Sequence, residues 1–118
     1  MTIILEANDK VPYWVNSGLP TVGFRMPSHP ITLELIRAFG PLIGPSANIS
    51  GHTSGVSFEE ILKEFGQEVL GIEDDTFLTG QDSTILDLTA CKARILRQGL
   101  ITREDILAKI PEIPFEEV

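Results

Sequence analysis

Two periodicities alternate along this chain, and their interleaving leaves few possible folds. Short apolar runs that suit strands are separated by segments whose apolar residues recur every three or four positions. The clearest of these segments covers residues 57–66, where Phe58, Ile61, Leu62 and Phe65 fall on one helical face. Interleaved strands and helices are typical of the α/β class, so we predict an open, twisted mixed sheet with flanking helices.

Start and stop signals divide the sequence into elements. Ser57 with Glu60, for example, forms an S-x-x-E capping box at the start of a helix. We predict strands at 2–7, 21–26, 42–44, 68–72, 83–89 and 93–99, a loop at 8–20, and helices at 29–40, 57–66 and 102–110. Residues 1–110 then form one domain, and residues 111–118, which contain two prolines, form an acidic mobile tail.

The composition argues against several classes of function. Nine Lys and Arg against 17 Asp and Glu give the 118 residues a net charge of -8, which disfavours a nucleic-acid coat or an anionic-membrane binder. The single cysteine, Cys91, cannot form an internal disulfide, so we predict that the protein is cytoplasmic. No apolar run reaches the ~20 residues of a membrane span, and no membrane association is expected.

Common enzyme motifs are absent from the sequence. The two histidines, His29 and His52, do not form an H-E-x-x-H zinc motif, and no protein-bound metal is expected. His29 suits the start of a helix better than the role of a ligand or a base. The sequence also lacks a G-x-S-x-G elbow, a P-loop and a G-x-G-x-x-G turn.

Small polar residues gather instead in three segments at predicted strand ends. Their members are Thr21, Arg25, Ser46, Asn48, Ser50, Ser54, Ser83, Thr84 and Arg97. Hydroxyls and backbone N–H groups can bind phosphate oxygens, and an arginine adds a bidentate contact to phosphate or carboxylate. Because ligand crevices of open α/β sheets lie at strand ends, we predict an anion or nucleotide site. A plain surface residue is the alternative for Arg97.

The last predicted strand carries two further expectations. Ala93, Ile95 and Arg97 share one face of the strand by its period of two. Gly99, just beyond the strand, leaves room for another backbone segment to approach closely.

Taken together, the three segments resemble the threonylcarbamoyl-AMP synthase family, the YrdC-like proteins. TVGFRMPSHP at 21–30 is similar to the family's T-V-x-x-R-x-P-x-H-P segment, and GPSANISG at 44–51 to its P-S-A-N-x-S-G signature. STILDLT at 83–89, followed by ILRQG at 95–99, resembles the closing S-T-[VI]-[VI]-D … I-[LI]-R-x-G block. The motifs occur in order, and the resemblance covers residues 2–107.

This resemblance implies an activity. The family makes threonylcarbamoyl-adenylate from L-threonine, bicarbonate and ATP with release of pyrophosphate, and the product serves the threonylcarbamoyladenosine (t6A) modification of tRNA. The enzymes are nucleotidyltransferases, and ATP would arrive with Mg²⁺. Double-stranded RNA and other tRNA-modification proteins are further partners that the resemblance implies.

The resemblance also assigns roles to residues that match the family's motifs. It implies ATP contacts by Thr21, Ser46, Ser54 and Arg97, and L-threonine contacts by Arg25, Gly44 and Ser83. Asn48 and Ser50 belong to the signature, where we expect them to shape the loop, with ligand contact as the alternative role of Asn48. No residue is assigned as catalytic, because positioning and charge neutralisation can serve carboxylate attack at the α-phosphate.

The sequence departs from the family at its start. Family members carry an earlier half with a basic K-R-x-x-x-K-P segment, whereas Met1 here directly precedes the strand at 2–7. We therefore expect a truncated YrdC-like domain that is inactive alone. We also expect a homodimer or larger assembly, because the missing half would leave a sheet edge or an apolar face uncovered.

Two other interpretations stay open. The chain could be a binding module that takes up nucleotide, double-stranded RNA or a partner without turnover. RNA would need a cluster of Lys92, Arg94, Arg97 and Arg103, although a few surface cations on an acidic protein are the simpler interpretation. The second interpretation is that the chain is a folded remnant without activity.

Overall fold

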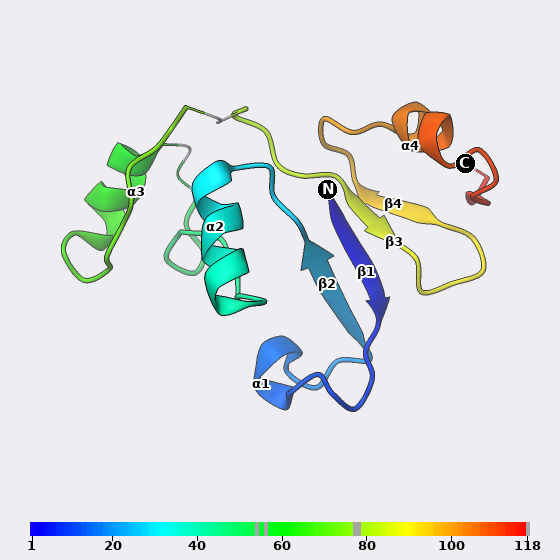
Figure 1. Cartoon of the computed structure of the whole chain (residues 1–118), viewed down its shortest axis with the longest axis horizontal. Coiled ribbons are helices and arrows are strands. Elements are labelled where there is room, and N and C mark those ends of the chain that lie inside the picture. Colours follow the sequence, from blue (N-terminus) through cyan, green and yellow to red (C-terminus); the bar gives the residue numbers. More distant parts are fainter. Residues whose placement is uncertain (54, 56, 77–78, 118) are drawn as a thin grey trace.

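In the computed structural model, which describes residues 1–53, 55, 57–76 and 79–117, one mixed sheet organises the chain (Figure 1). Its strands are β1 (Thr2–Glu6), β2 (Thr21–Arg25), β3 (Ile85–Asp87) and β4 (Arg94–Arg97), in the order β2-β1-β3-β4. β1 is antiparallel to β2 and parallel to β3, and β3 is antiparallel to β4. The predicted α/β class with a mixed sheet is confirmed.

Four helices flank the sheet in the described part of the chain. They are α1 (Tyr13–Asn16), α2 (Pro30–Phe39), α3 (Phe58–Phe65) and α4 (Arg103–Lys109). Figure 1 shows α2 beside β2, α3 farther from the sheet at the same end, and α4 beside β4 at the other end. Within the described residues no helix has the length and apolar character needed to cross a membrane.

Capping residues explain where two of the helices begin. Ser57 accepts a hydrogen bond from the Glu60 backbone while the Glu60 side chain accepts one from the Ser57 backbone, the predicted capping box of α3. Thr102 and Asp105 make the same pair of bonds at α4. The short helix α1 falls inside the segment that was predicted to be a loop, so that prediction is wrong at these four residues.

The strands predicted at 42–44 and 68–72 are wrong. Neither segment joins the sheet, and Leu42, Ile43, Val69, Leu70 and Ile72 are all exposed. A short apolar run acquires strand structure only by pairing with a neighbour, and local sequence does not reveal whether that neighbour exists.

The core of the described part lies on one face of the sheet, between β3, β4 and α4. Leu86, Ala93 and Ile106 are buried there and form its centre. Partly buried residues packed against them are Met1, Leu88, Ile95, Ile113 and Phe115. The core is small, and it draws on the C-terminal segment as well as on the sheet.

That C-terminal segment runs alongside the start of β4. The Ala93 N–H donates to the Pro114 carbonyl at 2.7 Å, and the Glu116 N–H donates to the Ala93 carbonyl at 3.0 Å. The Arg103 guanidinium also lies 4.9 Å from the centre of the Phe115 ring. These contacts attach the segment to the start of β4 and to α4, and the mobility expected from its prolines stays a prediction.

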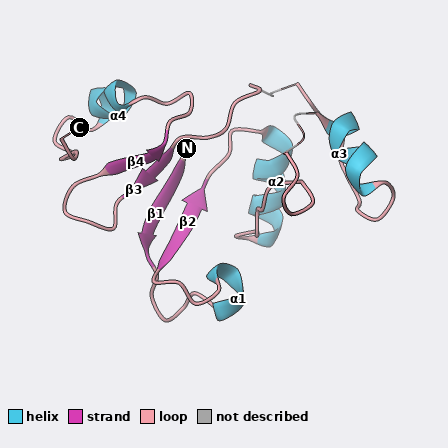
Figure 2. Cartoon of the chain, turned by 180° about the vertical axis from the view of Figure 1, so that it is seen from behind, coloured by secondary structure: helices cyan, strands magenta, loops and turns pink. Residues whose placement is uncertain are grey.

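The chain is open for its size. Its accessible surface is 9368 Å², whereas a compact monomer of this mass exposes about 6,300 Å². Its radius of gyration is 16.2 Å, whereas a compact domain of this length has about 13–14 Å. Seen from behind, α2 and α3 extend to one side of the sheet instead of stacking closely over it (Figure 2). Much apolar surface is therefore uncovered.

Candidate ligand-binding site

A cavity of about 890 Å³ opens between the sheet, α2 and the loop that follows α2. Four of the predicted contact residues line it: Arg25 at the end of β2, Gly44 and Ser46 in the loop, and Arg97 at the end of β4. Its volume lies within the range of small-molecule sites, about 300–1,000 Å³. The fold thus gathers around one space residues that are up to 72 positions apart in sequence.

The two arginines belong to one row of residues that crosses all four strands. Arg25 pairs with Thr2, Thr2 pairs with Ile85, and Ile85 pairs with Arg97. Paired residues point to the same face of a sheet, so both guanidinium groups emerge on the side opposite the core. Thr2, in the middle of the row, also lines the cavity.

An irregularity in β4 brings Arg97 to this face. Leu86 pairs with Ile95, but Ile85 pairs with Arg97, so Leu96 is an extra residue in β4. The prediction that Arg97 shares a face with Ile95 is therefore wrong, because Ile95 packs on the core and Arg97 lines the cavity. Bulges of this kind occur beside binding sites, where they redirect a side chain.

The segment before β3 holds the Arg97 side chain. Arg97 Nε donates to the Ser83 carbonyl oxygen at 3.0 Å, and its Nη1 lies 3.3 Å from the Asp82 carboxylate. Ser83 thus reaches the site through its backbone, next to the arginine. The remaining N–H groups of the guanidinium can bind an anion in the cavity.

The loop at 44–53 is fixed by its own residues and by α3. Asn48 Nδ2 donates to the Ile49 and His52 carbonyls at 3.0 and 3.1 Å, the kind of bond that a loop-shaping residue makes. Glu64 of α3 accepts from the Ile49 N–H at 2.9 Å and lies 2.9 Å from His52 Nδ1. Ser50 is exposed in the same turn.

One predicted ATP contact, Thr21, does not line the cavity. Thr21 lies at the opposite end of β2 from Arg25, about 13 Å away along the strand, and its carbonyl accepts from Asn16 Nδ2. Ser54 lies outside the described residues. Their assignments rest on the sequence resemblance.

Among the lining residues that the sequence did not assign to a ligand are His29, Thr32 and Asp82. His29 is at the predicted helix start, where its ring lies 3.2 Å from the Asp74 carbonyl oxygen and 3.7 Å from the Asp74 carboxylate. Thr32 interrupts the apolar pattern of α2, a signal that could have indicated a lining role. Asp82 directly precedes Ser83.

Hydrogen bonds set the charge state of two nearby carboxylates. The Thr89 hydroxyl and N–H donate to Asp87, with Arg94 on its other oxygen, and these contacts hold the pKa of Asp87 below its ordinary value. Hydrogen bonds from Thr76 lower the pKa of Asp74. Both acids are therefore charged at neutral pH. No three His, Cys, Asp or Glu residues within the described ranges are grouped as a metal site.

Three of the four cations proposed for RNA binding already have partners within the chain. Arg94 is paired with Asp87, Arg97 with Asp82, and Arg103 lies over Phe115 on the core side of the sheet. RNA binding stays a prediction from the resemblance.

Fold and site together define an α/β domain with a small-molecule cavity between two arginines. A family model described as telomere recombination, the Sua5–YciO–YrdC model, matches residues 1–99. The chain therefore belongs to the Sua5–YciO–YrdC family, as its motifs predict.

Curated relatives and a solved structure agree with this assignment. The threonylcarbamoyl-AMP synthases of Pyrococcus abyssi and Bacillus subtilis are 37% and 39% identical to it, over 96% of this chain. The crystal structure of P. abyssi Sua5 complexed with L-threonine matches with a TM-score of 0.82 at 37% identity, over 98% of this chain and 34% of that one. The chain thus spans about a third of the length of these relatives, 34% in each case.

Proposed function

We propose that this chain forms an L-threonine- and ATP-binding part of a threonylcarbamoyl-AMP synthase site. The cavity lined by Arg25, Gly44, Ser46 and Arg97 carries the proposal, since the family motifs assign all four to one of these two substrates. The similarity to a Sua5 structure complexed with L-threonine supports threonine as one ligand.

In the proposed reaction, the amino group of L-threonine and bicarbonate form a carbamate with loss of water. The carbamate carboxylate then attacks the α-phosphate of ATP, and the bond to the bridging oxygen breaks so that pyrophosphate leaves. Arg97 would neutralise phosphate charge, and Arg25 would bind the threonine carboxylate. Gly44 and the Ser46 hydroxyl would offer close, uncharged contacts. Mg²⁺ would be carried by the ATP phosphates. The residues would act by positioning and electrostatics.

We propose binding without turnover for this chain alone. Arg25 and Arg97 line only part of a wide cavity, and the surrounding surface is more open than in a compact domain. The P. abyssi and B. subtilis synthases are about three times as long as the segment that they share with this chain, given the 34% coverage. Bicarbonate use and product formation would then require the additional wall that a longer relative provides.

Calorimetric titration with ATP and Mg²⁺, with and without L-threonine, tests the proposal. We expect saturable ATP binding that Arg97→Ala weakens by at least about tenfold, the loss of one charge-assisted contact. Arg37→Ala is the matched control, because Arg37 lies on α2 and is paired with Glu34 outside the cavity. No heat at millimolar ATP, or equal effects of the two variants, would contradict the proposal.

A second copy of this chain is the partner that we propose for the uncovered surface. β2 is an edge strand, and Phe24 within it is 52% exposed. At the other edge, the C-terminal segment already pairs with Ala93.

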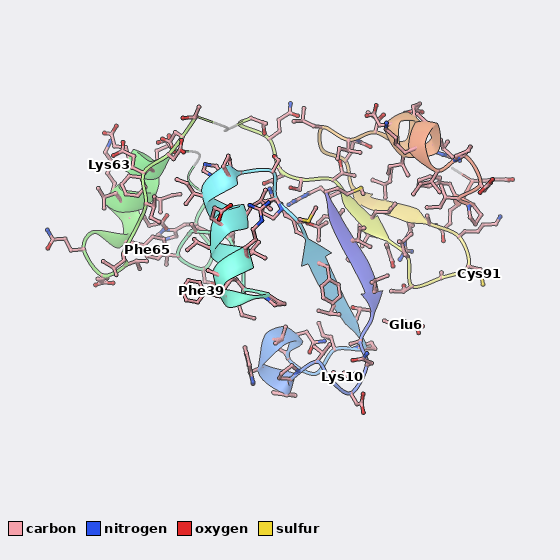
Figure 3. All side chains as sticks on the ribbon, viewed as in Figure 1. Glu6, Lys10, Phe39, Lys63, Phe65 and Cys91 are labelled. Carbon is pink, nitrogen blue, oxygen red and sulfur yellow. The ribbon has the colours of Figure 1, made fainter. Side chains whose placement is uncertain are left out.

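We also propose a cytoplasmic location, since the free Cys91 is exposed in the turn between β3 and β4 (Figure 3) and suits a reducing compartment.

A further inference from the structure

A buried threonine beside Ser83 joins two segments that both contribute to the candidate site. Thr84 is 1% exposed, and its hydroxyl donates to the Ile101 carbonyl at 2.6 Å. The same oxygen accepts from the Gly99 N–H at 3.0 Å. One side chain therefore ties the start of β3 to the turn that follows β4.

The two segments are in direct backbone contact at this point. A Cβ on Gly99 would lie 2.5 Å from the Thr84 nitrogen and still closer to the Asp82 carbonyl oxygen. Thr84 also accepts a bond from the Thr2 N–H at 2.7 Å, which attaches the same segment to β1. Thr84 thus links Thr2, which lines the cavity, to Gly99 and Ile101 in the turn after β4.

We infer that Thr84 is a positioning residue, which fixes the Arg97 guanidinium against the Ser83 carbonyl without touching a ligand. Its single donor is used by Ile101, and burial keeps it from the cavity. Arg97 is two residues before Gly99 and donates through Nε to Ser83, one residue before Thr84. Loosening the Thr84 bonds would therefore free both ends of the Arg97–Ser83 contact. The link to ATP affinity rests on the proposed function.

The Nε–H signal of Arg97 in ¹⁵N–¹H NMR spectra of the full chain tests the inference without any ligand. The signal is identified by its loss in Arg97→Lys. We expect a Nε–H that exchanges slowly in wild type and in Thr84→Ser, which keeps the hydroxyl. In Thr84→Val it should exchange as fast as the exposed Arg37 Nε–H. If Thr84→Val does not fold, Thr84→Cys, with its weakly donating thiol, takes its place.

An unchanged Arg97 signal in the folded Val or Cys variant would overturn the inference, and so would its loss in folded Thr84→Ser. ATP titrations then test the consequence for binding. Thr84→Val should weaken ATP by about tenfold in wild type and not at all in the Arg97→Ala background. Equal weakening in both backgrounds would indicate a general structural effect and overturn positioning through Arg97. If wild type binds no ATP, the proposed function fails, while the NMR result still decides the role of Thr84.

Discussion

Arg25 and Arg97 stand at the two ends of one row of residues across the sheet, separated by Thr2 and Ile85. Three strand spacings put their backbones about 14 Å apart, enough for a ligand to lie between the two side chains. Both face the cavity, on a chain whose net charge is -8. The cavity thus carries two arginines, one of them paired with Asp82, on an acidic protein, and local positive charge of this kind favours anionic ligands.

The first prediction separates the roles of these two arginines. We expect Arg25→Ala to weaken L-threonine binding by about 10- to 100-fold and Arg97→Ala to weaken ATP binding by a similar factor. Each variant should affect the other ligand less, because the side chains start from opposite ends of the row. Calorimetry with each ligand measures this pattern, and Arg37→Ala is the control. Equal losses of both ligands in both variants would refute the assignment.

The second prediction concerns the extra residue in β4. Deleting Leu96 would make Ile95 and Arg97 neighbours in a regular register, so Ile95 would stay on the core face and Arg97 on the cavity face, still opposite Ile85. We expect the folded deletion variant to bind ATP like wild type, because the guanidinium is not turned toward the apolar core. Leu96→Ala keeps the residue count and should bind ATP like wild type. Loss of ATP binding in a folded deletion variant, with Leu96→Ala unaffected, would show that Leu96 is more than an extra residue between Ile95 and Arg97.

Local signals were sufficient to predict much of this fold. Ser57 with Glu60, and Thr102 with Asp105, mark two helix starts through hydrogen bonds between residues three apart. Such bonds depend on nearby residues, so a sequence pattern can reveal them. The strands at 42–44 and 68–72 failed for the opposite reason, since strand pairing depends on distant partners.

The same distinction between local signals and long-range pairing applies to the candidate site. Motif positions predicted Arg25, Gly44, Ser46 and Arg97, and all four line one cavity. The face on which Arg97 lies was not predicted, because no glycine marks the extra residue in β4 and the pairing with Ile85 is set by the sheet. The close approach at Gly99 was predicted, although the sequence did not identify the partner as the backbone of residues 82–84.

The third prediction follows from that approach. Gly99→Ala would push a Cβ into the backbone at Asp82 and Thr84, neither of which can move like a side chain. We expect a loss of about 1–3 kcal/mol in the free energy of unfolding, measured by urea denaturation. Gly44→Ala is the control for stability, since its Cβ would meet no atom within 4 Å. Equal stability of the two variants would argue that the 82–84 segment is not held against Gly99.

The fourth prediction is a pH dependence of stability. Bonds from Thr89 and Arg94 lower the folded-state pKa of Asp87, so its charged form stabilises the fold above the unfolded pKa of about 4. This stabilisation is lost as the pH falls through the lower folded pKa. The free energy of unfolding should therefore decrease below about pH 5, and Asp87→Asn should flatten this decrease.

Urea denaturation at a series of pH values measures this effect. The decrease should persist in part in Asp87→Asn, since hydrogen bonds from Thr102 also lower the pKa of Asp105. The exposed Asp9→Asn is the matched control and should keep the wild-type slope. A slope for Asp87→Asn as steep as that of Asp9→Asn would count against the role of Asp87.

The last prediction concerns self-association through β2. Within the described residues no strand pairs with its outer edge, and an antiparallel β2–β2 pair of two copies would be self-complementary. We expect a dimer by light scattering, favoured at higher salt because each copy carries a charge of -8. Phe24→Glu should shift the protein to monomer by placing like charges across the pair. Phe39→Glu, at the exposed end of α2 (Figure 3), should remain dimeric. A monodisperse monomer of wild type over a wide concentration range would exclude this assembly and leave the uncovered surface to a different polypeptide.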